Sequence, residues 1–133
     1  MSFELVVQQA IYEKLAADLA YPIYDDVKQA DDSGNGAEFP YITIGEDVHT
    51  TIDTDTELIN QVSITIHTWS RFAGRSETKQ IQGLIYGALH RANLSATGYN
   101  FINIAQVNSE SQLDSDGFTR HGIQTFNLLI EEL

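Results

Sequence analysis

One segment, Leu58 to Arg91, changes its hydrophobic period midway, and this change constrains the fold more than any other feature. From Val62 to Trp69 apolar and polar residues alternate, which predicts a half-buried strand. Residues 70–75 break the pattern, and Gly74 among them can adopt a positive φ. Apolar residues then recur at helical spacing, at Ile81, Leu84, Ile85, Ala88 and Leu89. We expect this helix to cover the apolar face of the strand.

The remaining periodicities predict four further elements and two connecting segments. The elements are a first helix ending before Pro22, and strands at 39–45, 100–112 and 119–131, with an acidic hairpin arm at 46–57. Residues 22–24 suit a short edge strand or an extended link, and residues 28–38 suit a surface loop. The order helix, strand, strand, helix, strand, strand predicts an α+β fold. We expect an antiparallel sheet built from hairpins, with two helices packed on one face, in a single domain over 1–133.

The strand at 100–112 is expected to depart from strict alternation. Its apolar members are Ile102, Ile104 and Val107, and the spacing from Ile104 to Val107 predicts a bulge near Ala105. In the last strand Phe126, Leu128 and Ile130 keep the alternation and are expected to face inward. The sequence Asp-Ser-Asp-Gly at 114–117 between the two strands predicts a hairpin turn.

Charge is the second constraint, because 19 acidic and 7 basic residues give a net charge of −12. Such a chain repels nucleic-acid phosphates, whose binding proteins rely on Lys and Arg to displace counterions. The acids concentrate between Asp25 and Glu57, and four of the bases follow, at Arg71, Arg75, Lys79 and Arg91. The segregation has two interpretations: a solvated surface, or subunits that meet acidic face to basic face.

No motif in the chain carries catalysis. There is no cysteine, no Gly-x-Ser-x-Gly sequence and no Gly-rich phosphate loop. The four histidines lie on separate predicted elements, without the i, i+4 spacing of a helical metal site. We therefore predict no enzyme, no cofactor and no metal. The alternative is a small metal-dependent enzyme or ligand-binding domain that uses Asp53, Asp55 and Glu57 with a histidine.

Aromatic and arginine residues instead suggest a surface for association. Trp69, Arg71, Phe72 and Arg75 combine the residue types of interface hot spots, and we predict a subunit interface there. The alternative is that another part of the same chain covers them. The acids Glu46, Asp47, Asp53, Asp55 and Glu57 are predicted to face a channel or to dock a partner.

Four segments carry a resemblance to a known family: Tyr-Asp at 24–25, Phe-Pro-Tyr-Ile-Thr-Ile-Gly at 39–45, Trp-Ser-Arg at 69–71 and the turn at 114–117. In this order they resemble tail-completion proteins of long-tailed bacteriophages. This is the tail-terminator, or head–tail joining, group, which also occurs in prophages and gene-transfer agents. The resemblance spans essentially the whole chain.

The resemblance implies a structural virion protein, made in the bacterial cytoplasm, at the interface of head and tail. Members of the group form a ring, typically hexameric, that caps the tail tube and joins it to the head. The implied partners are further copies of the chain, the tail tube protein and a head-completion or connector protein. DNA passes through without specific binding, and no membrane is involved. A head-completion or minor tail protein is the nearest alternative function.

Overall fold

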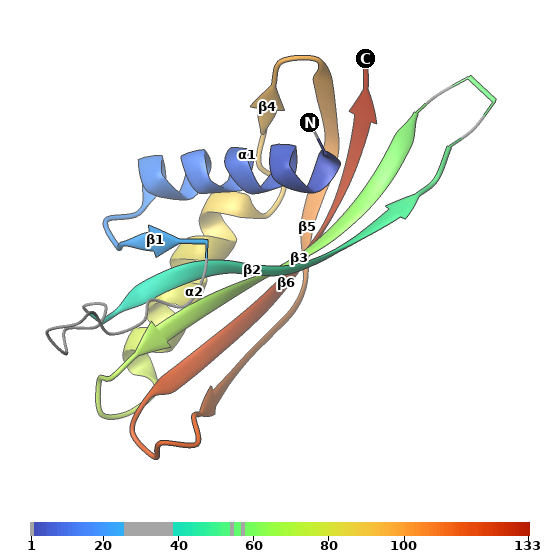
Figure 1. Cartoon of the computed structure of the whole chain (residues 1–133). Helices are drawn as coiled ribbons and strands as arrows, with labels where there is room; N and C mark the ends of the chain where they lie inside the picture. Colours follow the sequence, from blue (N-terminus) through green and yellow to red (C-terminus); the bar gives the residue numbers. More distant parts are fainter. Residues whose placement is uncertain (1, 26–38, 54, 57) are drawn as a thin grey trace, which may run out of the picture.

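The computed structural model describes residues 2–25, 39–53, 55–56 and 58–133. The elements are α1 Phe3–Asp18, β1 Ile23–Tyr24, β2 Tyr41–Thr51, β3 Ile59–Ser70, α2 Ser76–Leu89, β4 Ser95–Ala96, β5 Tyr99–Leu113 and β6 Arg120–Glu132 (Figure 1). The strands form one curled sheet in the order β1-β2-β3-β6-β5-β4. β1 runs parallel to β2, and every other neighbouring pair is antiparallel. The predicted loop at 28–38 lies outside the described residues.

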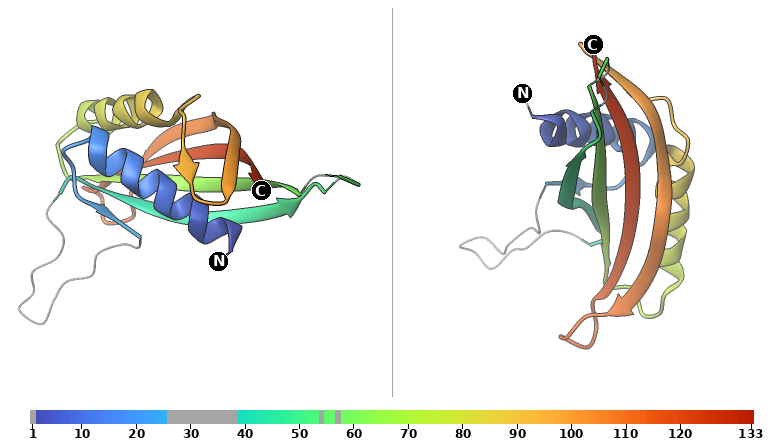
Figure 2. Two further views of the ribbon diagram at one scale, coloured as in Figure 1. Left: turned by 90° about the horizontal axis from the view of Figure 1, so that it is seen from above. Right: turned by 90° about the vertical axis from the view of Figure 1, so that its right-hand side faces the viewer.

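Both helices pack on one face of the sheet, where the hydrophobic core lies (Figure 2). The central strands β3 and β6 alternate strictly between buried and half-buried residues. Their core-facing members are fully buried, and they are Val62, Ile64, Ile66, Phe126, Leu128 and Ile130. The predicted α+β class, the hairpins and the shared helix face are confirmed. Two short strands, β1 and β4, extend the predicted order at the sheet edges.

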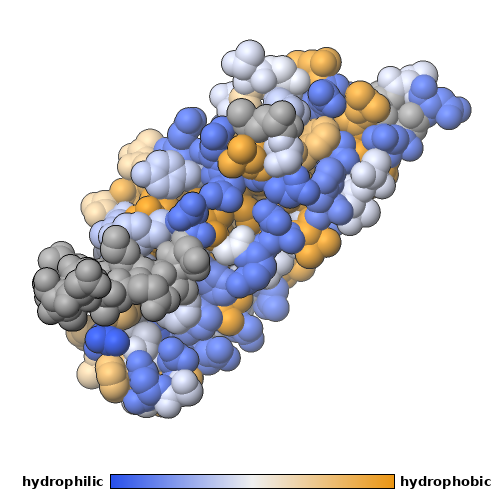
Figure 3. All heavy atoms as spheres, viewed as in Figure 1, coloured by the Kyte–Doolittle hydropathy of each residue, from blue (hydrophilic) through white to orange (hydrophobic). Residues whose placement is uncertain are grey.

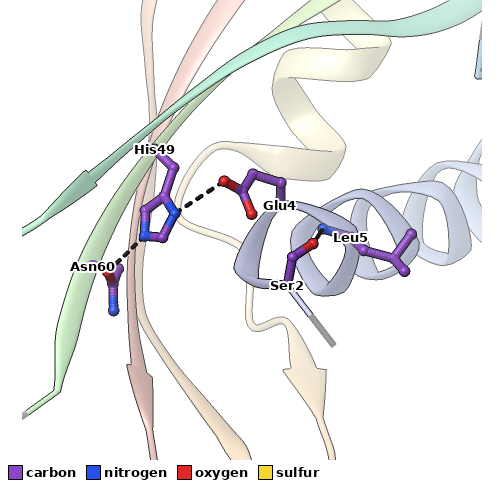
Figure 4. A network of polar contacts seen from close by, with 5 residues as sticks. All are labelled: Ser2, Glu4, Leu5, His49 and Asn60. Carbon is purple, nitrogen blue, oxygen red and sulfur yellow. Dashed lines mark hydrogen bonds and ion pairs between the residues drawn. The ribbon is translucent and has the colours of Figure 1, made fainter.

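Helix α1 begins and ends as its sequence indicates. The Ser2 side chain accepts a hydrogen bond from the Leu5 N–H and caps the first turn (Figure 4). Val7, Ile11 and Leu15 recur on the buried face. The helix ends at Asp18, well before Pro22.

In helix α2 the predicted buried face is confirmed at every position except Leu84. Gly74 has a φ of +113° in the preceding break, and Ile81, Ile85, Ala88 and Leu89 are buried as expected. Leu84 is not, because 46% of its surface is exposed. The buried stripe instead includes Gln82, whose Nε2 donates to the carbonyl oxygen of Glu110. Gln82 can be buried in place of the expected Leu84 because its polar side chain has a hydrogen-bond partner.

Strand β5 contains two register shifts rather than one, between Phe101 and Asn103 and between Gln106 and Asn108. Each bulge adds one residue to β5, so that the residues before and after it still alternate between the two faces of the sheet in step with β6. Ile104 is buried, whereas the extra residues Ile102 and Val107 are 46% and 59% exposed. The predicted single bulge near Ala105 is therefore replaced by two bulges, one on each side of that residue.

The sheet is long, and its two ends differ in character. The hairpin of β2 and β3 projects beyond the rest of the sheet, and the β3–α2 and β5–β6 connections lie at the opposite end (Figure 1). Of the acidic segment predicted as a hairpin arm, the described residues beyond β2, among them Asp53 and Asp55, lie at this extremity, whereas Glu46 and Asp47 lie midway along β2. On the face drawn in Figure 3, hydrophobic side chains are interspersed among hydrophilic ones.

Candidate functional site on the open face of the sheet

The sheet face turned away from the helices, here the open face, carries a row of stacked rings. Antiparallel pairing places Trp69 of β3 between Tyr41 of β2 and His121 of β6. The indole stacks on His121 with ring centroids 3.9 Å apart and an interplanar angle of 11°. Tyr41 lies on its other side at 6.3 Å. The Trp69 Nε1–H donates to the Thr43 hydroxyl at 3.1 Å, so the indole is held at both its ring and its polar atom.

Two histidines and a carboxylate adjoin this stack in one hydrogen-bonded chain. Nε2 of His67 lies 2.8 Å from a carboxylate oxygen of Glu46, and Nδ1 of His67 lies 2.6 Å from Nε2 of His121. Because Glu46 accepts from Nε2, the Nδ1 of a neutral His67 accepts from the N–H of His121. A bulge in β2 between Ile44 and Asp47 turns Glu46 toward the ring.

Two groups in this hydrogen-bonded cluster, Glu46 and His121, have shifted pKa values, and their contacts explain the directions. The hydrogen bond from His67 lowers the pKa of the Glu46 carboxyl. Burial lowers the pKa of His121, and the neighbouring charge of His67 lowers it further.

The cluster lacks the other parts of a catalytic site. A cavity of about 210 Å³ opens beside it, and the acids in its lining are Asp25 and Glu46. Asp53 and Asp55, which the enzyme alternative required, are not in that lining, and Glu57 lies outside the described residues. Within the described chain no group of three or more histidines and acids could hold a metal ion. The one hydroxyl in this lining is that of Thr43, and it accepts a hydrogen bond from the indole N–H of Trp69.

The predicted interface residues separate into two kinds. The Arg71 guanidinium lies between the rings of Phe39 and Phe118, 4.3 Å and 4.9 Å from their centroids. Trp69 and Arg71 therefore make ring contacts within their own chain, and Arg71 is also exposed, so the interface predicted there stays a prediction. Phe72 is 51% exposed and Arg75 is exposed, so these two can contact another molecule. Together with Phe118, 55% exposed, they form the surface that we call the aromatic end.

The predicted acidic residues lie along the projecting hairpin. Asp53 and Asp55 are exposed beyond the last residue of β2, at the end of the sheet opposite the aromatic end (Figure 1). Asp47 is exposed midway along β2, opposite Ile64 of β3. His49 joins the same arm to α1, with its Nδ1 3.0 Å from Glu4 and its Nε2 2.6 Å from Asn60 (Figure 4). A backbone hydrogen bond at the helix start lowers the pKa of Glu4, and His49 adds to this. The arm is therefore anchored to the helix layer at its base.

Sequence reasoning missed the pairing of His67 with His121. The two residues are 54 positions apart, and a search for helical spacing cannot find them. The available signal was the register of two long antiparallel strands, which places Trp69 opposite His121. The carboxylate of Glu46 bonds His67 and is still exposed, so its predicted place on a channel or docking surface stays a prediction.

Fold and site together define a class: an α+β structural domain whose charged and aromatic extremities, rather than a catalytic centre, are its distinctive features. The chain belongs to the tail completion protein gp17 family, whose model matches residues 9–131. It is 28% identical over 118 residues to the tail completion protein gp17 of Bacillus phage SPP1, covering 88% of this chain and 86% of the phage protein.

A solved structure supports the same fold. A chain in the virion of a native gene transfer agent particle superposes with a TM-score of 0.80 at 18% identity, covering 94% of both chains. The family membership confirms the predicted resemblance, the virion location and the assignment as a structural protein rather than an enzyme. None of the described helices is long and apolar enough to cross a membrane.

Proposed function

We propose that this tail completion protein forms a closed homo-oligomeric ring, a hexamer, that caps the tail tube and joins the tail to the head. The observation that carries the proposal is the placement of unlike surfaces at opposite ends of one chain. A head-to-tail ring needs two complementary patches on each subunit, and both must be able to engage at once.

The aromatic end and the hairpin arm supply such patches. Phe72 and Phe118 offer exposed rings beside Arg75, and the arm offers Asp53 and Asp55 beside the apolar Ile52, which is 42% exposed. Aromatic residues and arginine at the centre of a contact, with carboxylates from the neighbour, are typical of stable interfaces. In the proposed ring the hairpin of each subunit packs against the aromatic end of the next.

The proposed partners are the tail tube protein on one side of the ring and a head-completion or connector protein on the other. DNA passes through the centre without specific binding, because a subunit with a net charge of −12 repels phosphates. In this proposal the negative charge of the subunits keeps DNA from binding as it passes, and the aromatic end and the hairpin arm close the ring.

Cysteine cross-linking tests the ring directly, because the natural chain contains no cysteine. Particles assembled with the double variant Arg75→Cys and Asp55→Cys should give, after oxidation, a ladder of linked subunits that ends at six. Each single variant is the matched control and should give no species beyond a dimer. Absence of the ladder in intact particles would contradict the contact, and a ladder ending at another number would correct the stoichiometry.

A further inference from the structure

The edge of β2 along the hairpin arm is open, whereas the opposite edge of the sheet is partly sealed. On β5, β4 pairs with Tyr99 and Asn100. Beyond them the Ile104 carbonyl accepts from the Arg91 N–H, and the Gln106 N–H donates to His90 Nδ1. On β2, β1 pairs only with Ile42 and Thr43. No strand among the described residues pairs with this edge from Gly45 to Thr51.

The hydrogen-bond pattern shows which backbone groups face outward on β2. The Ile52 N–H donates to the Ile59 carbonyl, so this residue pair is a hydrogen-bonded pair of the antiparallel ladder. Hydrogen-bonded and non-hydrogen-bonded pairs alternate, and the register pairs Asp47, His49 and Thr51 with β3 in the non-bonded positions. The N–H and C=O groups of these three residues therefore point away from β3. Such a row is a template for an added strand.

The charge around this edge selects what can be added. Residues 39–61 contain no lysine or arginine, and the arm carries the acids Glu46, Asp47, Asp53, Asp55 and Glu57. An added strand with basic side chains would meet opposite charges, and an acidic strand would meet like charges. Val48, 65% exposed on the open face, offers one apolar contact to a neighbour on the new strand.

No described edge strand of a second copy is suitable. Two β2 edges would bring acidic arms together. The part of β5 without a backbone partner on its outer side, residues 108–113, contains Glu110, whose carbonyl oxygen accepts from Gln82, and no base. We propose that the β2 edge from Asp47 to Thr51 binds an extended, basic segment of a different protein as an added antiparallel or parallel strand. Backbone hydrogen bonds supply the affinity, and the acidic arm supplies the preference for lysine or arginine. The inference concerns a single subunit and does not require the ring.

Three seven-residue peptides test the proposal. The first alternates lysine with valine or threonine, the second has the same sequence with alternate backbone nitrogens methylated, and the third replaces lysine by glutamate. In the presence of the first at ten times its Kd, amide hydrogen exchange at Asp47, His49 and Thr51 should slow about tenfold. Exchange at Val48 and Thr50, which already bond to β3, should not change. The methylated and acidic peptides should give no protection.

A proline substitution separates strand addition from charge attraction. Thr51→Pro removes one outward N–H and leaves the ladder with β3 intact, since proline is tolerated where the N–H of an edge strand faces solvent. It should weaken binding of the basic peptide several-fold, whereas Thr51→Val, which keeps the N–H, should not. Equal protection by the methylated peptide, or equal binding to both variants, would overturn the proposal. Failure of the cross-linking ladder would leave this result unaffected, so the two proposals fail separately.

Discussion

Gly45 lies directly against the ring of His67: a Cβ at this position would come within 2.7 Å of both Cδ2 and Nε2 of the imidazole. Real side chains do not tolerate such a contact, and the third nearest atom, the Thr65 carbonyl oxygen at 3.4 Å, belongs to rigid backbone. The missing side chain at 45 therefore makes the room in which His67 reaches Glu46. The bulge and the histidine pair are one structural unit.

Gly45→Ala should consequently displace the His67 ring and lower the free energy of unfolding by about 1–3 kcal/mol, as overpacking does. Urea unfolding measures the change, and the NMR signals of the two imidazoles report the ring position. Gly83→Ala is the matched control, because nothing lies within 4 Å of its added Cβ. In the helix interior that variant should stabilise the protein by about 0.5–1 kcal/mol. Equal effects of the two substitutions would contradict the steric argument.

The histidine pair also predicts how stability depends on pH. The pKa of His121 is lowered from 6.5 in the folded protein, chiefly by burial. Between that lowered value and 6.5 the unfolded chain binds more protons, so stability falls as pH decreases through this window. Glu46, with a pKa lowered from 4.5, stays ionised there and contributes its own loss only at more acidic pH.

His121→Gln should therefore flatten the stability curve between pH 7.5 and 5.5, measured by urea unfolding at several pH values. His90→Gln is the control, because His90 bonds the Gln106 N–H at the far side of the sheet and is not part of the pair. An unchanged slope in His121→Gln, with the wild-type slope intact, would show that another group dominates the window.

How much the sequence could predict depends on whether a signal is local. Alternation in β3 and β6 and the periodicity of α1 are set by neighbouring residues, and those predictions are confirmed. The two bulges of β5 depend on the partner strand, so single-strand alternation located only their midpoint. Helical periodicity alone favoured Leu84 for the buried face of α2. Gln82 is buried instead, and its hydrogen bond to the Glu110 carbonyl, which makes this possible, is formed with a distant strand.

The candidate site was less predictable for the same reason. Exposure of the acids Glu46, Asp47, Asp53 and Asp55 follows from their charge, whereas the channel or partner that they were predicted to face stays a prediction. The contacts of Trp69 and Arg71 are made with strands far along the chain, at His121 and Phe118. Their residue types indicated an interface, which stays a prediction, but gave no sign of these contacts within the chain.

Arg71 and Arg75 should therefore respond differently to truncation, although the chain places them four residues apart. Arg71→Ala removes two cation–π contacts and the hydrogen bond from Nε to the Thr119 hydroxyl. It should lower the free energy of unfolding by about 1–2 kcal/mol. Arg75→Ala should change it by less than about 0.5 kcal/mol, as exposed substitutions do. Denaturant unfolding of both variants is the measurement, and equal losses would contradict the assignment of Arg71 to its own chain.

The acidity of the hairpin arm predicts a gain of DNA binding when it is reversed. The triple variant Asp47→Lys, Asp53→Lys and Asp55→Lys places three cations on β2 and its hairpin tip, within a segment, residues 39–61, that has acids but no lysine or arginine. It should retain double-stranded DNA at low salt, with log K falling by up to about 3 per tenfold rise in salt if all three contact phosphates. The wild type and the matched variant with asparagine at the same positions should show no retention. Filter binding across a salt series is the measurement.

Retention of DNA by the asparagine variant would show that lost repulsion alone suffices. Absence of retention by the lysine variant would contradict the role given to the arm. Particles carrying the lysine variant should also deliver less DNA, because a retaining surface slows passage through a channel.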